Sequence, residues 1–250
     1  MSDWPRALQA SPPAVSLPRP STWARLWLPA VVVLLALYAG LPWLAPVFMH
    51  LGWTSGADAI YAVYSTQCHQ LPQRSLFLFG PRLMYSLSQI QSAWQDTANP
   101  MILRQFTGSE AMGWKVAWSD RMTSMYLSLA VFVALYRPVL RRLRLPWWIF
   151  VLLLVPLAVD GVSHAASDLA GIGAGFRDGN AWLAALTNNS LPETFYAGDA
   201  LGSFNSWMRL LTGLLFGLGV AGLALPQLEA AFGARSHPLN PRNNRFPPQP

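Results

Sequence analysis

Uncharged apolar runs alternate with polar segments along this chain, and the longest of them have the length of helices that cross a bilayer. Residues 26–57 contain no charge, and about 20 apolar residues are enough for one span. Residues 122–136, 145–159 and 207–228 form three further apolar runs. This pattern predicts an all-α polytopic membrane protein with four transmembrane helices.

Particular residues inside these runs modify the spans. Pro42 and Pro46 are expected to kink or end the first helix, because proline breaks the helical hydrogen-bond ladder. The run 122–136 is too short for a bilayer core of about 30 Å, so a flanking charge pair should lie inside the bundle or reach back to its surface. Gly213 and Gly217 have the spacing at which another helix can approach closely.

The segments between the spans are expected to form a cap of helices and loops. Residues 58–118 and 165–205 carry recurring charges and only short apolar runs. Helices are predicted at 57–66 and 83–94, and the glycine-rich stretch 171–175 is predicted to be a flexible connection.

The ends of the chain have a different composition from its middle. Residues 1–24 and 231–250 are rich in proline and poor in apolar residues that could be buried, which is typical of disordered tails. Residues 25–230 are expected to form one transmembrane domain with its cap.

Composition agrees with a bilayer environment. Hydrophobic residues make up 53% of the chain and charged residues only 11%, against about a quarter in soluble proteins. The net charge of +6 comes mostly from arginines at the ends of apolar runs, so no nucleic-acid partner is expected. The single cysteine, Cys68, excludes an intrachain disulfide.

The arginines also predict an orientation in the membrane. The loop 137–144 is short, contains four arginines and has no acidic residue. Positively charged loops stay on the cytoplasmic side, so both termini are expected in the cytoplasm and the cap outside it, in a multi-pass protein of the cell membrane.

Polar residues gather at the end of the bundle where the cap lies. Asp160 and His164 share a helix face, and Asp160 is expected to pair with Arg121 or Arg209, and Asp120 with Arg74. Such pairs could equally be structural. The candidate site residues are Cys68, His69, Gln70, Arg74, Ser75, Asp120, Arg121, Asp160, His164, Asn205 and Arg209.

Two kinds of chemistry are open to this set. Cys68, His69 and His164 are candidate metal ligands with Asp160, although their spacing matches no metal motif and a buried thiol with a hydrogen-bonded imidazole explains them equally well. Alternatively, Arg74, Arg121 and Arg209 could clamp an anionic head group such as a lipid phosphate. No cofactor is specified.

The motifs together resemble a family of prokaryotic multi-pass membrane proteins of unknown function. Its members carry Cys-His-Gln-x-Pro-x-Arg-Ser, found here at residues 68–75, and a later Cys-x-Arg-Cys-x-Gly-Ile-Tyr-x-Gly motif. The resemblance covers residues 60–225, but Ser119 and Met122 stand where the second motif has cysteines. A thiolate site that relatives could build with Cys68 is therefore not expected in that form.

The sequence favours a non-catalytic membrane component that binds a partner subunit, a lipid or a cofactor at the extracytoplasmic face. Membrane lipids and other membrane subunits are the expected partners. The alternative is a metal-dependent enzyme or redox protein at that face, which would use Cys68, His69, Asp160 and His164.

Overall fold

Three helices in this computed structural model, which describes residues 22–234, are long and apolar enough to cross a membrane. They are α1 (Thr22–His50), α6 (Trp147–Asp168) and α10 (Phe204–Ala234). A fourth helix, α5 (Asp120–Ala134), is shorter and continues through a π-helical turn, η2 (Tyr136–Leu140). These helices confirm the prediction of a mainly helical membrane protein.

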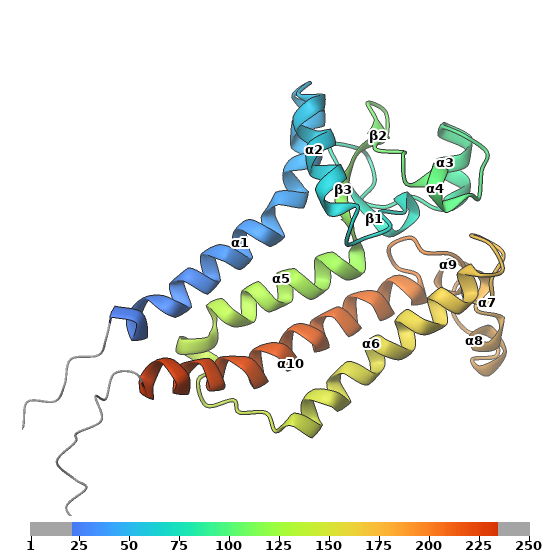
Figure 1. The fold of residues 1–250 in the computed structure, drawn as a ribbon. Helices are drawn as coiled ribbons and strands as arrows, with labels where there is room; N and C mark the ends of the chain where they lie inside the picture. Colours follow the sequence, from blue (N-terminus) through green and yellow to red (C-terminus); the bar gives the residue numbers. More distant parts are fainter. Residues whose placement is uncertain (1–21, 235–250) are drawn as a thin grey trace, which may run out of the picture.

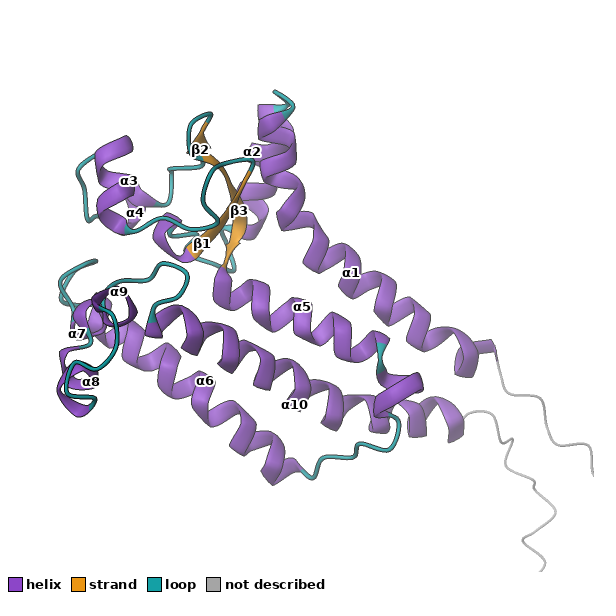
Figure 2. Cartoon of the chain, turned by 180° about the vertical axis from the view of Figure 1, so that it is seen from behind, coloured by secondary structure: helices purple, strands orange, loops and turns teal. Residues whose placement is uncertain are grey.

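The four helices lie side by side in the order α1, α5, α10, α6 (Figures 1 and 2). Helix α10 packs against α5 on one side and α6 on the other, and α5 also packs against α1. At one end of this bundle α5 and α10 begin and α6 ends; we call this the cap end.

The close approach predicted at Gly213 and Gly217 is confirmed between α5 and α10. A Cβ atom on Gly217 would lie 2.2 Å from Ser128 Oγ, and one on Gly213 would lie 2.7 Å from Ser124 Oγ. Ser128 Oγ donates a hydrogen bond to the Gly213 carbonyl at 3.1 Å. Small residues thus let the two backbones meet, with hydroxyl groups bonding across the interface.

The first helix does not end at Pro42 or Pro46, although an end there was one of the two outcomes predicted for these prolines. Helix α1 runs through Pro42 and Pro46 to His50, and both prolines are buried. Ala39 and Ala45, on either side of Pro42, pack in a core cluster with Trp118. This tertiary packing compensates for the hydrogen bonds that the prolines remove.

The first half of the cap contains a sheet, which the all-α prediction missed. Strands β1 (Ser75–Leu78), β3 (Gly113–Ser119) and β2 (Gly108–Ser109) are antiparallel in the order β1-β3-β2. Four consecutive residues of β3, 115–118, are buried, so the strand lacks the alternation that marks strands in a sequence.

Short helices complete this half of the cap. The predicted helices at 57–66 and 83–94 correspond to α2 (Thr54–Tyr64) and the shorter α3 (Leu87–Ala93). The remaining helical turns here are η1 (Pro72–Arg74) and α4 (Pro100–Leu103).

The second half of the cap follows α6. It contains the short helices α7 (Phe176–Gly179), α8 (Ala181–Leu186) and α9 (Glu193–Tyr196). A loop precedes α7, as expected for the glycine-rich stretch.

The predicted tails fall almost wholly outside the described residues. The two exceptions are the start of α1 at Thr22 and the end of α10 at Ala234, since each helix extends into the range assigned to a tail.

Candidate functional site

Four arginines and four aspartates gather at the cap end of the bundle in two networks of ion pairs, which we together call the cluster. Their formal charges balance, and they come from the cap as well as from α5, α6 and α10. The Arg121 backbone N–H links the two networks by donating to Asp120 Oδ1 at 2.8 Å. The members of this cluster are Arg74, Arg121, Arg177, Arg209, Asp120, Asp160, Asp168 and Asp199.

Arg74 ties the first half of the cap to the bundle. Its Nη1 and Nη2 donate to the two carboxylate oxygens of Asp168, at 2.7 and 2.8 Å, and its Nε donates to Asp199 at 2.7 Å. Burial alone would lower the pKa of Arg74, but the hydrogen bond to Asp168 and the charge of Asp199 raise it above the usual arginine value. The side chain therefore keeps its charge and both partners.

Arg209 is 1% exposed, and each of its three side-chain nitrogens donates a hydrogen bond. Its Nε donates to both oxygens of Asp120, at 2.7 and 2.9 Å, and its Nη groups donate to the side chain and the carbonyl of Asp199 at 2.6 and 2.7 Å. Burial would raise the pKa of Asp199, but Arg74 and Arg209 outweigh it and hold the pKa well below its usual range. Asp199 thus joins two of the arginines.

Asp160 joins the other two arginines. It accepts from Arg121 Nη2 at 2.7 Å and from Arg177 Nη2 at 2.8 Å. Arg177 is further held by Asn205 Oδ1 at 3.0 Å and Ser163 Oγ at 2.7 Å. Asn205 is accordingly a second support for Arg177, as the Asn205 amide also donates to the Arg177 carbonyl at 2.7 Å.

The predicted pairing of Asp160 with Arg121 or Arg209 is confirmed, with Arg121 as the partner, and the predicted pairing of Asp120 with Arg74 is wrong. Asp160 does not pair with Arg209, and Asp120 does not pair with Arg74. Because α5 packs directly on α10, Asp120 of α5 is the carboxylate next to Arg209. The buried position of Asp120 also confirms that a charge flanking the short apolar run lies inside the bundle.

Sequence reasoning missed three members of the cluster. Arg177 and Asp199 lie in the second half of the cap, where no helical period relates them to the rest of the site. For Arg177 and Asp199 the only signal was their charge, which several exposed residues share. Asp168 is the last residue of α6, four residues after His164, but it lies beyond residue 159, where the predicted span ended.

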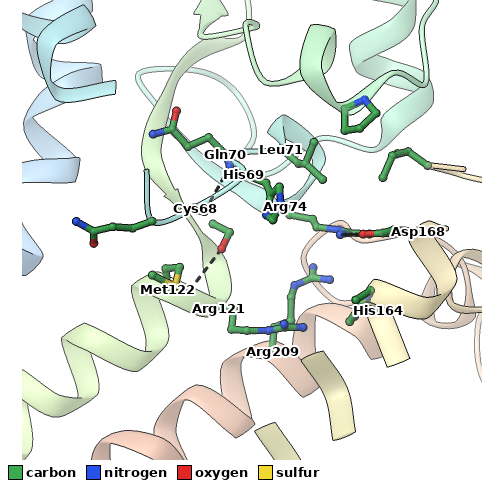
Figure 3. Close-up of a pocket in the computed structure, with 15 residues that line it drawn as sticks. Cys68, His69, Gln70, Leu71, Arg74, Arg121, Met122, His164, Asp168 and Arg209 are labelled. Carbon is green, nitrogen blue, oxygen red and sulfur yellow. Dashed lines mark hydrogen bonds and ion pairs between the residues drawn. The ribbon is translucent and has the colours of Figure 1, made fainter. Parts of the chain in front are cut away.

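A cavity of about 390 Å³ lies beside the cluster, between the bundle and the cap (Figure 3). It brings together seven of the predicted site residues from four separate segments of the chain. Its lining residues are Gln67, Cys68, His69, Gln70, Leu71, Arg74, Pro100, Ser119, Arg121, Met122, His164, Ala165, Asp168, Ile172 and Arg209.

The other four predicted residues, Ser75, Asp120, Asp160 and Asn205, do not line this cavity. Ser75 Oγ donates to the Leu71 carbonyl at 2.9 Å and stabilises the turn that carries Arg74. The others orient arginines of the cluster, as described above.

Gln70 has a structural role in the cavity wall. It has a positive φ of 52°, and its amide donates to the Tyr61 carbonyl at 2.9 Å. Its own carbonyl accepts from Lys115 Nζ at 2.9 Å, and the same ammonium donates to the Arg104 carbonyl. Burial lowers the pKa of Lys115 to about 7.

The candidate metal ligands Cys68, His69 and His164 all line the cavity. Within residues 22–234, however, no group of three or more His, Cys, Asp or Glu side chains is placed to hold a metal ion. Ser119 and Met122, where the family resemblance implies cysteines, line the same cavity as Cys68.

Arg121 and His164 have hydrogen-bonding capacity that the cluster does not use. The Arg121 side chain is 21% exposed and donates one hydrogen bond, and its Nε has no partner among the described residues. His164 Nε2 lies 3.2 Å from Arg177 Nη2, which can only donate, so Nε2 is the acceptor and the proton is on Nδ1. His164 Nδ1 also has no partner in the described chain.

Comparison with known proteins also indicates a membrane protein. Residues 109–223 match the family described as Predicted membrane protein (DUF2085). This stretch includes α5, α6 and most of α10, with Arg121, Asp160 and Arg209, but not the Cys68–Ser75 motif.

An archaeal protein is also similar to this chain in sequence. The uncharacterized protein MJ1492 of Methanocaldococcus jannaschii is 30% identical over 130 residues, which are 48% of this chain. The chain covers 62% of the relative's length. No solved structure matches. Together with the three apolar helices, these similarities support a membrane protein of unknown function.

Proposed function

We propose that the protein crosses the membrane four times and binds an anionic group, without catalysing a reaction, in the cavity at the extracytoplasmic end of the bundle. The fourth span is α5 with η2. Residues 120–140 would extend roughly 30 Å at 1.5 Å per residue, and α5 lies between α1 and α10.

Aromatic and charged residues support this placement in the bilayer. Exposed tryptophans occur near both ends of the long helices, as at the two interfaces of a membrane. Trp147 and Trp148 begin α6 at one end, and Trp207 lies in the first turn of α10 at the other. The arginine-rich loop 137–144 at the end away from the cap supports cytoplasmic termini.

The incomplete pairing of Arg121 is the main observation that supports an anionic ligand. Arg74 and Arg209 each hold two carboxylates, so the three-arginine clamp expected from the sequence reduces to one available guanidinium. Arg121 shares its single carboxylate, Asp160, with Arg177. A phosphate or carboxylate could therefore bind its free nitrogens in the bidentate manner that guanidinium favours.

Two further features favour an anion. Helix α5 begins at the cavity wall, where Ser119 is its N-cap, so the positive end of its dipole lies beside Arg121. The N–H of His164 Nδ1 adds a donor without a partner among the described residues.

A binding role is favoured over catalysis because each carboxylate of the cluster is already paired. Asp120, Asp160, Asp168 and Asp199 each accept hydrogen bonds from arginine, so their oxygens are engaged in ion pairs rather than free to take a proton from a substrate. A cofactor or an acidic side chain of a partner subunit could supply the same anionic group.

Ligand binding to the purified full-length chain tests this proposal. The probes are lysophosphatidate and glycerol 3-phosphate, with lysophosphatidylcholine as the zwitterionic control, and the readout is the shift in melting temperature. We expect at least one phosphate probe to stabilise the wild type more than lysophosphatidylcholine does, and Arg121→Gln to remove that difference.

Arg141→Gln is the matched control, because Arg141 also donates to one carboxylate, Glu229, but at the opposite end of the bundle. It should respond as the wild type does. Equal shifts for the phosphate probes and the zwitterion, or for Arg121→Gln and the wild type, would contradict the proposal.

A further inference from the structure

The cavity reaches the protein surface where its lining residues are exposed. Four of them are exposed: Gln67, His69, Pro100 and Ala165. The first three belong to the cap, whereas Ala165 is on α6. The mouth of the cavity therefore lies between the cap and one side of α6.

That side of α6 is the exposed apolar face of a candidate membrane span. Val155, Val162 and Leu169 are 46%, 70% and 90% exposed, and their spacing of seven residues places them on one stripe. Ala165 is three residues from Val162 and four from Leu169, on the same side of the helix. In a bilayer this stripe faces lipid chains, so the mouth opens at the edge of the lipid.

We infer that the cavity is entered sideways from the bilayer, past Ala165, and that its ligand is an amphiphile with an anionic head group. The head group binds Arg121 inside the cavity, and the hydrocarbon chain lies along the α6 stripe outside it. This inference rests on the proposed function, because it names the source of the anionic group.

The character of the mouth fits such a ligand. Gln67 and His69 give it polar groups on the cap side, while Pro100 and Ala165 offer apolar surface. A volume of about 390 Å³ is at the low end for small-molecule pockets, which suits a head group rather than a whole lipid. A dissolved anion would gain nothing from an entrance beside an apolar helix stripe.

The test compares a tailed and a tailless phosphate on the detergent-solubilised full-length chain. Dissociation constants for lysophosphatidate and glycerol 3-phosphate are measured by native mass spectrometry. We expect lysophosphatidate to bind at least tenfold more tightly than glycerol 3-phosphate. Ala165→Trp, which fills the mouth of the cavity, should raise the dissociation constant of lysophosphatidate at least tenfold. The dissociation constant of glycerol 3-phosphate should change by no more than about twofold.

Ala166→Trp is the matched control, since Ala166 is an exposed neighbour on α6 that does not line the cavity. The milder Ala165→Leu is used if the tryptophan variant does not fold. Equal affinity for the two phosphates, or equal effects of the substitutions at 165 and 166, would overturn the lateral entrance. In those cases, binding that depends on Arg121 would still uphold the proposed function. If Arg121→Gln binds both probes as the wild type does, both proposals fail.

Discussion

Arg121 of α5 and Asp160 of α6 meet at the cap end of the bundle, with 2.7 Å between Nη2 and Oδ2. The two helices pack on opposite sides of α10, so this ion pair bridges two elements that a third helix separates. Asp160 also pairs with Arg177, and so one carboxylate links the bundle to the second half of the cap.

Replacing Asp160 by Asn should destabilise the protein strongly. Arg121 and Arg177 would lose their shared anion, and breaking a buried pair typically costs about 3–5 kcal/mol. The melting temperature in detergent measures this effect. Glu229→Gln is the control, because it breaks an ion pair in which Arg141 is exposed, for which a cost of about 0–1 kcal/mol is usual. Similar decreases in melting temperature in the two variants would show that the Asp160 ion pairs contribute no more to stability than an exposed pair does.

Replacing Gly217 by Ala should loosen the contact between α5 and α10. The added methyl group would lie 2.2 Å from Ser128 Oγ and 2.7 Å from the Leu129 backbone nitrogen, so a side-chain rotation cannot relieve the overlap. Overpacking of this kind costs roughly 1–3 kcal/mol. Gly40→Ala in α1 meets no atom within 4 Å and should be neutral or stabilising. The comparison of the two melting temperatures decides whether close backbone packing is required at Gly217.

The stability should depend on pH through Lys115. Burial lowers its pKa to about 7 in the folded protein, whereas an unfolded lysine has a pKa of about 10.4. Between these values the unfolded chain binds more protons, so the free energy of unfolding should rise with pH by at most about 1.4 kcal/mol per unit. The cost in stability of burying the charged Lys115 ammonium is complete below pH 7 and disappears as the pH approaches 10.

Melting curves of the wild type and Lys115→Met between pH 6 and 9 test this dependence. The difference in melting temperature, wild type minus variant, should stay constant below pH 7 and increase above it. Parallel curves across the whole range would mean that Lys115 titrates normally in the folded state.

The orientation in the membrane can be tested with single cysteines in a Cys68→Ser background. Ser92 lies in the cap and Arg142 in the arginine-rich loop, and both are exposed. In intact cells a membrane-impermeant thiol reagent should label Ser92→Cys and not Arg142→Cys, while permeabilised cells should show both. The opposite pattern would reverse the proposed topology.

Hydrophobic patterning alone indicated much of the bundle. Uncharged apolar runs predicted the three long apolar helices, and the spacing of Gly213 and Gly217 predicted a close helix contact. The i, i+4 relation of Asp160 and His164 placed both on one buried face of α6. These features are local, since they depend on chain length, helical period and side-chain size within one element.

Other features depended on contacts between distant segments. Helix α1 continues through Pro42 because Ala39 and Ala45 pack against residues more than 70 positions away, and β3 forms because β1 and β2 pair with it. Neither outcome could be predicted from a local pattern, because the compensating interactions come from elsewhere in the chain.

The sequence by itself determined that this is a mainly helical membrane protein with a polar cluster at one end of its bundle, because span length and charge placement are properties of single segments. Only the tertiary structure decided which charges pair and where a ligand could bind. Arg177 and Asp199 reach the cluster from the cap, and their positions follow from long-range folding. Asp168, Asp199 and Asp120 pair with Arg74 and Arg209. Among the three arginines that line the cavity, Arg121 therefore keeps nitrogens without a partner in the described chain.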